Sequence, residues 1–291
     1  MRPVTTIEFS KGHGTLNDFV LVEDVEGRLD LADTDVRFLA DRRAGIGGDG
    51  VIRIVPTQLA PQDVQQLNPG TRWFMDYRNA DGSAAEMCGN GTRVFAHYLR
   101  THGLETAQSY DIATRAGTKR ITVLADDSYR TDLGGWRLAR GDEAEQRGMD
   151  SVVQVHGFAD ALPALSLDLG NPHTVVALPL KVDLDALDLA QAPHVDPHPE
   201  HGTNVEFVRA LEPGHISMRV HERGVGETLS CGTGAAAAAL ATWWWAGRPA
   251  DQTSWTVDLP GGRLGVHLDA ERVALSGPAA IVATGRVTLP G

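Results

Sequence analysis

Hydrophobic and polar positions divide the chain into many short apolar runs, and clusters of turn residues separate these runs. The runs are three to five residues long and rich in Val, Ile, Leu and aromatic residues, a pattern typical of β-strands. Gly, Asp and Asn occur between them, as in the turn Asn79-Ala80-Asp81-Gly82. We predict strands at Thr6–Phe9, Phe19–Val22, Val51–Val55, Trp73–Tyr77, Tyr110–Thr114, Arg120–Leu124, Leu165–Leu169, Val175–Ala177, Val205–Arg209, Ile216–Val220, Trp255–Leu259 and Leu264–Leu268.

Three segments have the longer apolar pattern of α-helices. Leu31–Arg43 carries apolar residues on one face only, whereas Gly91–His102 and Thr233–Ala246 are apolar around most of their circumference. The last two segments end at Gly103 and Gly247, and glycine commonly terminates a helix. A helix that is apolar on all sides must be buried on all sides. We therefore expect each of these two helices to be wrapped by its own set of strands.

The chain has two cysteines, and each stands directly before one of the two buried helices. They open similar phrases, Cys88-Gly89-Asn90-Gly91 and Cys231-Gly232-Thr233-Gly234. The cysteines are 143 residues apart, about half of the 291-residue chain. This spacing predicts an α+β protein of two similar domains, each a set of strands around one helix with the cysteine at the mouth of the helix. A boundary near Leu133-Gly134-Gly135 divides the chain accordingly.

Two thiols at helix N-termini are suited to acid–base chemistry on a bound anion. The partial positive charge of a helix N-terminus favours anions and is expected to lower the pKa of a thiol. The N–H groups of Gly89 and Asn90, and of Gly232 and Thr233, would then form two anion sites. One thiolate and one thiol on opposite faces of a carbon could remove a proton and return one, which inverts the stereocentre.

Other roles for the cysteines are a pair of buried structural residues, a disulfide, or a redox or metal-binding module. The spacing argues against the last of these, because neither phrase has the Cys-x-x-Cys form of such sites.

Composition excludes several classes of partner. The formal net charge is −12, the pI is about 5.3, and no Lys/Arg cluster offers phosphate contacts, so we expect neither a nucleic-acid nor a membrane partner. The longest apolar run, Ala235–Ala246, is too short to span a bilayer. Met1–Ser10 lacks the apolar core of a secretory signal, and two free cysteines fit a reducing compartment. We predict a cytoplasmic protein; the sequence leaves open whether it is a homodimer.

Three features suggest cofactor or metal sites, but each is better explained otherwise. Gly45–Gly50 fits G-x-G-x-x-G, yet a helix precedes it and a strand follows, the reverse of a dinucleotide site, so we predict a turn. His194–His201 contains two prolines that prevent helical alignment of ligands, so we predict a surface loop. None of the three lysines lies in a phosphate-cradling context, which argues against pyridoxal phosphate. We expect neither cofactor nor metal.

Taken together, the motifs resemble those of the diaminopimelate epimerase family, in the family's order and over nearly the whole chain. The segments that carry the resemblance are Lys11–Phe19, Asn79–Ser83, Glu86–Gly91, Gly170–His173, Gly202–Val205, Glu222–Thr228 and Cys231–Gly234.

This resemblance implies a fold and an activity. The fold has two pseudo-symmetric domains, each a barrel-like sheet around a central helix, with the active site in the cleft between them. The last strand, around Val282–Leu289, returns to the first domain, which gives domains of residues 1–133 plus about 277–291, and 134–276. The implied activity is cofactor-independent interconversion of LL- and meso-diaminopimelate, in lysine and peptidoglycan biosynthesis.

The resemblance also implies roles for individual residues. Cys88 and Cys231 would be the acid–base pair, and His173 and Glu222 would flank the reacting centre, bind the α-amino group and tune the thiols. The substrate would be held by Asn17, Asn79, Asn171, Asn204 and Arg223, together with Gly89, Asn90, Glu222, Gly232 and Thr233. An arginine such as Arg223 can bind the distal carboxylate of the substrate bidentately.

Two features depart from the family pattern. Many members have Gln directly after the Gly-Asp turn, where this chain has Gly50, so one substrate hydrogen bond is expected to be missing or supplied elsewhere. Ala139–Asp150 is expected to be an additional acidic loop without an assigned role.

A neighbouring family, the proline racemases and hydroxyproline epimerases, also uses two cysteines. It usually has His in place of Asn90 and Asp-Arg-Ser-Pro before its second Cys, where this chain has Glu222-Arg223 and Glu227–Ser230. These differences favour diaminopimelate epimerase.

Overall fold

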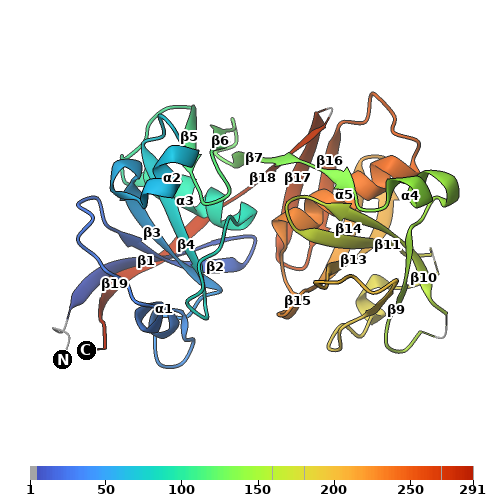
Figure 1. Ribbon diagram of the computed structural model, residues 1–291, viewed down its shortest axis with the longest axis horizontal. Helices are drawn as coiled ribbons and strands as arrows, with labels where there is room; N and C mark the ends of the chain where they lie inside the picture. The colour runs from blue at the N-terminus through green and yellow to red at the C-terminus, as the bar shows by residue number, and fades with distance from the viewer. Residues whose placement is uncertain (1–4, 159, 180, 270, 291) are drawn as a thin grey trace. The chain divides into compact units, whose positions relative to one another are not determined.

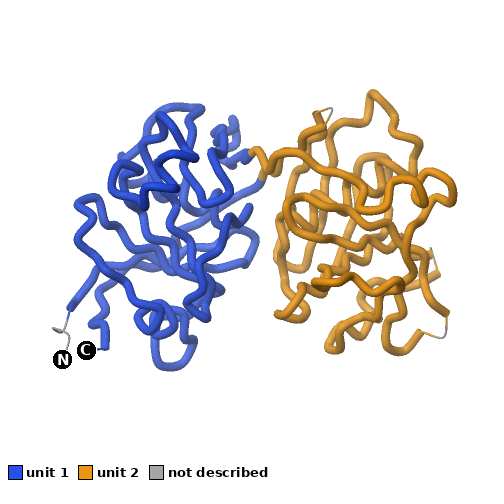
Figure 2. Tube along the Cα trace, in the orientation of Figure 1, with its two compact units in different colours: residues 1–131, 277–291 blue, residues 132–276 orange. Residues whose placement is uncertain are grey.

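The chain folds into two compact units, shown in blue and orange in Figure 2. The computed structural model describes residues 5–158, 160–179, 181–269 and 271–290. Unit 1 consists of Met1–Thr131 and Gly277–Gly291, and unit 2 is Asp132–Ser276. The chain passes from one unit to the other twice, within strand β7 (Tyr129–Gly135) and at the end of strand β18 (Arg272–Gly277). In the described part of the chain, no helix has the length and apolar character needed to cross a membrane.

In its described residues, unit 1 is a mixed sheet with three α-helices. Its strands are β1 (Thr6–Gly14), β2 (Asn17–Glu23), β3 (Gly50–Pro56), β4 (Trp73–Asn79), β5 (Ser109–Ala113), β6 (Lys119–Val123), the start of β7, and β19 (Ala280–Thr288). Its helices are α1 (Asp33–Ala40), α2 (Gln62–Leu67) and α3 (Gly89–Thr101). The short 3-10 helix Thr57–Leu59 follows β3.

The described part of unit 2 contains the end of β7, the remaining strands and two α-helices. Its strands are β8 (Arg137–Leu138), β9 (Ser151–Gln154), β10 (Leu162–Asp168), β11 (Pro172–Ala177), β12 (His194–Asp196), β13 (Asn204–Glu212), β14 (His215–Glu222), β15 (Gly226–Thr228), β16 (Ser254–Leu259), β17 (Gly262–Asp269) and β18. Its helices are α4 (Gly141–Arg147) and α5 (Gly232–Trp245), with a 3-10 turn at Leu184–Ala186.

The two units repeat one order of strand pairing. In unit 1, β1 and β2 are antiparallel, β2 and β3 parallel, β3 and β4 antiparallel, β4 and β5 parallel, and β5 and β6 antiparallel. In unit 2, the strands β10, β11, β13, β14, β16 and β17 follow the same sequence of pairings. The helix that begins after a cysteine lies between the fourth and fifth strands in both cases, α3 in unit 1 and α5 in unit 2.

Each of these helices is buried within the strands of its own unit. Helix α3 contacts β1, β2, β3, β4 and β19, and helix α5 contacts β10, β11, β13, β14, β16 and β17 (Figure 1). Val94, Phe95 and Leu99 of α3 are fully buried in the core of unit 1. In α5, the alanines at 235–239 are all fully buried, and their small side chains let the strands approach the helix closely. The α+β fold with a buried helix in each unit is confirmed.

The predicted strands and the three predicted helices are all present, but two loop predictions are wrong. The acidic segment Ala139–Asp150 contains helix α4, which is held against the end of α5: Trp245 Nε1 donates to the carbonyl of Gly148 at 2.8 Å, and Arg248 pairs with Glu145. Within the His-rich segment, His194–Asp196 forms strand β12, which pairs with β9. Both short elements are stabilised by contacts with distant parts of the chain, so no local pattern predicts them.

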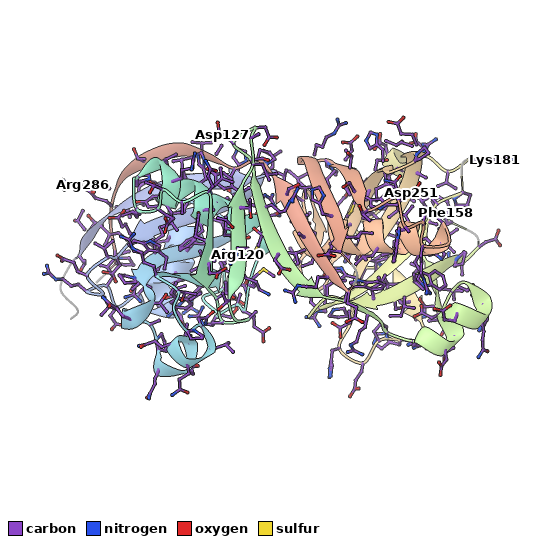
Figure 3. All side chains as sticks on the ribbon, turned by 90° about the horizontal axis from the view of Figure 1, so that it is seen from above. Arg120, Asp127, Phe158, Lys181, Asp251 and Arg286 are labelled. Atoms are coloured by element: carbon purple, nitrogen blue, oxygen red, sulfur yellow. The ribbon has the colours of Figure 1, made fainter. Side chains whose placement is uncertain are left out.

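Strand β19 completes the sheet of unit 1 from the far end of the sequence. It pairs with β1 over its length, from Thr6 opposite Thr288 to His13 opposite Ala280. Arg286 of β19, labelled in Figure 3, pairs with Glu8 of β1, with 3.2 Å between Nη2 and Oε1. The strand expected at Val282–Leu289 is therefore paired as the resemblance implied.

Candidate active site

Each cysteine is the N-cap residue of the buried helix of its unit. Cys88 has extended backbone angles (φ −139°, ψ 120°), and its Sγ accepts from the N–H of Gly91 at 3.4 Å. Cys231 has nearly the same conformation (φ −120°, ψ 116°), and its Sγ accepts from the N–H of Gly234 at 3.3 Å. In this extended conformation each sulfur lies over the first turn of its helix, where it caps a backbone N–H as the side-chain oxygen of Ser or Asp commonly does. Both thiols are free of a disulfide.

In unit 1, two asparagines surround Cys88. The Cys88 thiol donates to Asn17 Oδ1, with a sulfur–oxygen distance of 3.6 Å. The Asn90 amide donates to the same oxygen at 3.1 Å, so this acceptor joins β2 to the start of α3. Asn17 and Asn90, which sequence reasoning proposed as substrate ligands, therefore lie beside the sulfur of Cys88.

The position of Asn17 is fixed by Asp49, which the sequence analysis did not identify. Asn17 Nδ2 donates to Asp49 Oδ2 at 2.6 Å, and the N–H of Asp18 donates to the same oxygen at 3.1 Å. Arg42 in turn holds the carboxylates of Asp18 and Asp49, with distances of 2.7 and 2.8 Å from Nη2. The turn predicted at Gly45–Gly50 thus orients the amide of Asn17.

Asn79 lies on the same edge of the unit 1 sheet, opposite Gly50 in the β3–β4 register. Its Oδ1 accepts from the Tyr77 hydroxyl at 3.0 Å, and its Nδ2 donates to Ser83 Oγ at 3.0 Å. A Cβ at Gly50 would lie 2.5 Å from the carbonyl oxygen of Arg78 and 2.6 Å from Tyr77 Cε2. The Tyr77 ring therefore occupies the space that a side chain at position 50 would need.

In unit 2, a chain of hydrogen bonds runs from Cys231 into the buried core. The sulfur lies 3.7 Å from Thr233 Oγ1, which accepts from the amide of Asn171 at 3.3 Å. Asn171 Oδ1 is 3.0 Å from His173 Nε2, and His173 Nδ1 is 2.7 Å from Glu206 Oε1. The side chains of His173 and Glu206 are fully buried. Parallel pairing of β11 with β13 brings these residues together, because His173 lies opposite Asn204 in the register.

Glu222, Asn204 and Arg223 form the rest of this half-site. Thr228 Oγ1 donates to the carboxylate of Glu222, which is near enough to Cys231 to raise the pKa of its thiol. Asn204 Oδ1 accepts from the backbone N–H of Arg223 at 2.9 Å, and Asn204 Nδ2 donates to the carbonyl of Pro172 at 3.2 Å. Asn204 therefore fixes the backbone that carries Arg223, whose Nη1 donates to the carbonyl of His201.

The expected lowering of both thiol pKa values is wrong for Cys231. Burial raises the pKa of Cys231 well above its ordinary value, and the nearby carboxylates of Glu222 and Glu206 raise it further. The hydrogen bonds from Gly234 and Thr233 act in the opposite direction but are weaker. Burial also raises the pKa of Glu222 and of Glu206. The helix terminus alone therefore does not determine the charge on this sulfur.

Sequence reasoning missed two buried charged residues near the thiols, Arg93 and Glu206. Both are fully buried, Arg93 in the first turns of α3 and Glu206 in the middle of β13. One feature of the sequence could have identified them. Each is a charged residue inside a mainly apolar segment, Arg93 in the predicted buried helix Gly91–His102 and Glu206 in the predicted strand Val205–Arg209. Among the residues that the structure describes, no group of three or more His, Cys, Asp and Glu side chains is arranged to hold a metal ion.

The fold is similar to that of several solved structures. A hydroxyproline epimerase from Agrobacterium vitis aligns with a TM-score of 0.66 at 14% identity, covering 99% of this chain and 92% of that one. A phenazine biosynthesis protein of the PhzF family from Bacillus anthracis aligns with a TM-score of 0.67 at 16% identity, covering 97% and 99%. At such low identity the likeness concerns the fold.

Sequence similarity identifies the family more narrowly. The family model described as diaminopimelate epimerase matches residues 9–138 and 165–289. The diaminopimelate epimerase of Rhodococcus opacus is 44% identical over 97% of both chains, and that of Corynebacterium glutamicum strain ATCC 13032 is 44% identical over 98% of this chain and 99% of its own. This chain belongs to the diaminopimelate epimerase family. The resemblance drawn from the motifs is confirmed, and the proline racemase alternative is not.

Proposed function

We propose that the protein interconverts LL- and meso-2,6-diaminopimelate by a cofactor-independent mechanism with Cys88 and Cys231 as the two acid–base groups. Membership of the diaminopimelate epimerase family supports the reaction. The observation that carries the mechanism is that both cysteines cap a buried helix with the same geometry, each sulfur beside the N–H groups of a helix start. The helix starts suit a substrate carboxylate, and the sulfurs suit the hydrogen on the adjacent carbon.

In the proposed step, a thiolate takes the α-proton and the other thiol donates its proton to the opposite face of the same carbon. The C–H electron pair remains on the carbon as the transient carbanion and then forms the new C–H bond. The N–H groups of Gly89, Asn90, Gly232 and Thr233 would stabilise the negative charge that develops on the carboxylate. One proton is taken up and one is released, so no oxidant, reductant or cofactor is required.

The polar residues around each thiol would bind the rest of the substrate. Asn17, Asn79, Asn171 and Asn204 offer amide donors and acceptors, and Arg223 can pair with the distal carboxylate. His173 and Glu222 would contact the α-amino group and influence the protonation of Cys231. The two half-sites would act together on one substrate molecule.

The charge and the thiols of the protein also bear on its location in the cell and on its partner. The net charge of −12 and two free thiols support a cytoplasmic protein whose partner is its small-molecule substrate. The reaction would supply meso-diaminopimelate for lysine and peptidoglycan biosynthesis. Whether one chain or a homodimer is the active form is decided by measuring activity against protein concentration.

Isotope exchange tests this function directly. The reduced protein, without added cofactor, should incorporate deuterium from D2O at the α-carbon of diaminopimelate and convert the LL isomer to the meso isomer. Cys88→Ala and Cys231→Ala should each abolish epimerisation, while circular dichroism shows the fold retained. Exchange that persists in the double alanine variant would contradict the thiol mechanism, and exchange with proline instead of diaminopimelate would contradict the substrate.

A further inference from the structure

The two half-sites are alike in geometry but opposite in charge. Arg93 lies five residues after Cys88, and the matching position after Cys231 is Ala236. On the strands the difference is reversed. Gly91 of α3 faces Phe19 and Ile52, whereas the matching Gly234 of α5 faces Glu206. Unit 1 therefore has a buried cation and apolar strand residues at the thiol, and unit 2 has a buried carboxylate and no cation in its helix.

Arg93 is fully buried, and its guanidinium is held at the start of α3. Its Nη1 donates to the carbonyl of Gly89 at 3.2 Å, and its Nη2 donates to Asn90 Oδ1 at 3.0 Å and Thr15 Oγ1 at 3.3 Å. Its Nε donates to the carbonyl of Pro278 at 3.4 Å. Within the described ranges, no carboxylate forms an ion pair with it, and all four acceptors are neutral oxygens. Burial lowers the pKa of Arg93 to about 10, and the negative charge of a Cys88 thiolate acts against this decrease.

The guanidinium is thus a buried positive charge next to a group that can become negative. An isolated buried charge is unfavourable unless a partner compensates it. In α3 and the strands that pack against it, the other charged side chains already have polar or charged partners. These are Lys11 with Asp18, Arg53 with Asp76, Arg78 with Asp33, Glu23 with Tyr98, and Arg286 with Glu8. The other titratable side chains there are those of Tyr77, bonded to Asn79, His13, whose Nδ1 accepts from the N–H of Leu16, and His97, whose Nδ1 lies 3.1 Å from the Tyr129 hydroxyl. Arg100 lies in the last turn of α3, at the end of the helix away from Cys88. Cys88 is the ionisable group left to balance Arg93.

The surroundings of Cys231 have the opposite effect. On the strands that pack against α5, the carboxylates of Glu206 and Glu222 act on this thiol, and His173 is bonded to Glu206 Oε1, the oxygen that lies against Gly234. Other charged groups of these strands are paired elsewhere: Asp168 with Arg137, Arg219 with Glu227, Arg209 with Asp183, and Asp258 with His215 and Arg263. His221 is bonded to the carbonyl of Leu189, and His267 to Ser254. A thiolate at Cys231 would therefore be repelled by two buried acids.

We propose that Arg93 makes Cys88 the thiolate of the resting enzyme and that Glu206 keeps Cys231 in the thiol form. The assignment rests on the proposed acid–base role of the two cysteines and specifies which one begins as the base. Asn17 Oδ1 accepts from the Cys88 thiol, which favours the protonated form, but a thiol is a weak donor and the contact is long at 3.6 Å. The full positive charge of Arg93, which interacts electrostatically with Cys88, has the larger effect on ionisation. Arg93 is a positioning residue in this scheme, because it acts through Cys88 and Asn90.

Titration of each thiol in the absence of substrate tests the assignment. In Cys231→Ala and Cys88→Ala proteins, the rate of alkylation by iodoacetamide is measured against pH by mass spectrometry, and the midpoint gives the pKa of the remaining thiol. The midpoint of Cys88 should lie below that of Cys231. Arg93→Gln in the Cys231→Ala protein should raise the Cys88 midpoint by about one to two pH units, and Arg93→Lys should restore it. Arg100→Gln, which removes a charge from the other end of α3, is the matched control and should leave the midpoint unchanged.

A second variant keeps the proposal testable if Arg93→Gln does not fold. Glu206→Gln has nearly the same shape and keeps an oxygen for His173, and in the Cys88→Ala protein it should lower the Cys231 midpoint. A Cys231 midpoint below that of Cys88 would overturn the assignment, as would a folded Arg93→Gln protein with an unchanged Cys88 midpoint. Because alkylation needs no substrate, these outcomes are independent of whether diaminopimelate is the substrate.

The pH profile of kcat/KM gives a readout that a purely structural role would not change. The active enzyme carries one proton on the pair, so activity falls at low pH when Cys88 is protonated and at high pH when Cys231 loses its proton. Arg93→Gln should move the acidic limb to higher pH, and Glu206→Gln should move the alkaline limb to lower pH. If Cys231 were the resting thiolate, Glu206→Gln would instead move the acidic limb to lower pH, which contradicts the proposal.

Discussion

The glycines three positions after each cysteine, Gly91 and Gly234, have clearly different surroundings in the two half-sites. A Cβ at Gly91 would meet Cys88, Ile52 and Phe19 at 3.4 to 3.6 Å, an ordinary contact. A Cβ at Gly234 would lie 2.8 Å from Glu206 Oε1 and 3.2 Å from the sulfur of Cys231. A side chain at Gly91 of α3 would therefore fit without a clash. Gly234 of α5 is required, because a side chain there would clash with Glu206 and Cys231.

Alanine at these two positions should have opposite effects on stability. Gly91→Ala should leave the free energy of unfolding unchanged or raise it by up to about 1 kcal/mol, because alanine is the better helix former. Gly234→Ala should lower it by about 1–3 kcal/mol and reduce kcat, because the methyl group displaces Glu206 or Cys231. Urea unfolding and steady-state kinetics measure both effects. Equal destabilisation by the two substitutions would show that the Glu206 contact is not the cause.

At this scale, sequence identified the residues with recognisable motifs and missed those whose role comes from burial. Of the predicted residues, Asn17 accepts from the Cys88 thiol and Asn90 donates to the same oxygen, while Asn171 and His173 belong to the hydrogen-bond chain that begins at Cys231. Arg93 and Glu206 were not named, because the sequence does not show that their side chains lie under a thiol instead of at the surface. The pKa of Cys231 was misjudged for the same reason: the local helix start was visible, but the two carboxylates come from other strands.

Among the secondary-structure elements, the β3–β4 pair determines where Asn79 lies. Gly50 and Asn79 are register partners at the end of this pair, and the Tyr77 ring lies where a side chain at position 50 would be. The Tyr77 hydroxyl also orients the Asn79 amide. Where many family members have glutamine, this chain has Gly50, and the neighbouring Tyr77 donates a hydrogen bond to Asn79.

Restoring a side chain at position 50 should separate the two strands. Gly50→Ala brings a methyl group to 2.5 Å from the backbone oxygen of Arg78, so the strands must move apart. We expect a loss of about 1–3 kcal/mol in the free energy of unfolding and a higher KM for diaminopimelate, because Asn79 moves with β4. Gly141→Ala, where the nearest atom to the new methyl group is 4.0 Å away, is the control and should change neither. An unaltered KM and melting temperature in Gly50→Ala would contradict this view of the pair.

The elements that sequence predicted are those with the clearest apolar runs, and most of those it missed are short; the exceptions are strands β7 and β18, with seven and six residues. Strands β9, β12 and β15 have four, three and three residues, and helix α4 has seven. Such segments contain too few apolar positions to show a period, and their backbone pairs only with distant strands. Contacts with the rest of the unit stabilise them, which a local pattern does not contain.

For the whole molecule, the proposed reaction requires a thiol from each unit to reach one carbon. Two sulfurs that act on opposite faces of the same carbon would be near enough to be joined by an oxidant when the substrate is absent. We predict that mild oxidation links Cys88 to Cys231 and abolishes activity until a thiol reductant is added. Peptide mapping under non-reducing conditions would identify the bond, and Cys88→Ala should not form it. Activity that is insensitive to oxidant would contradict a mechanism based on two free thiols.

The order of strands in unit 1 has a consequence for how the protein is made. Strand β19 pairs with β1, which lies more than 260 residues earlier in the chain, and unit 2 is synthesised between them. During translation, unit 2 can form its whole sheet before β19 has been synthesised, while unit 1 must keep β1 without this neighbour until the end. The half-site with Cys88 is therefore completed last, and a ribosome that stalls before β19 releases a chain with one finished thiol site and one exposed sheet edge.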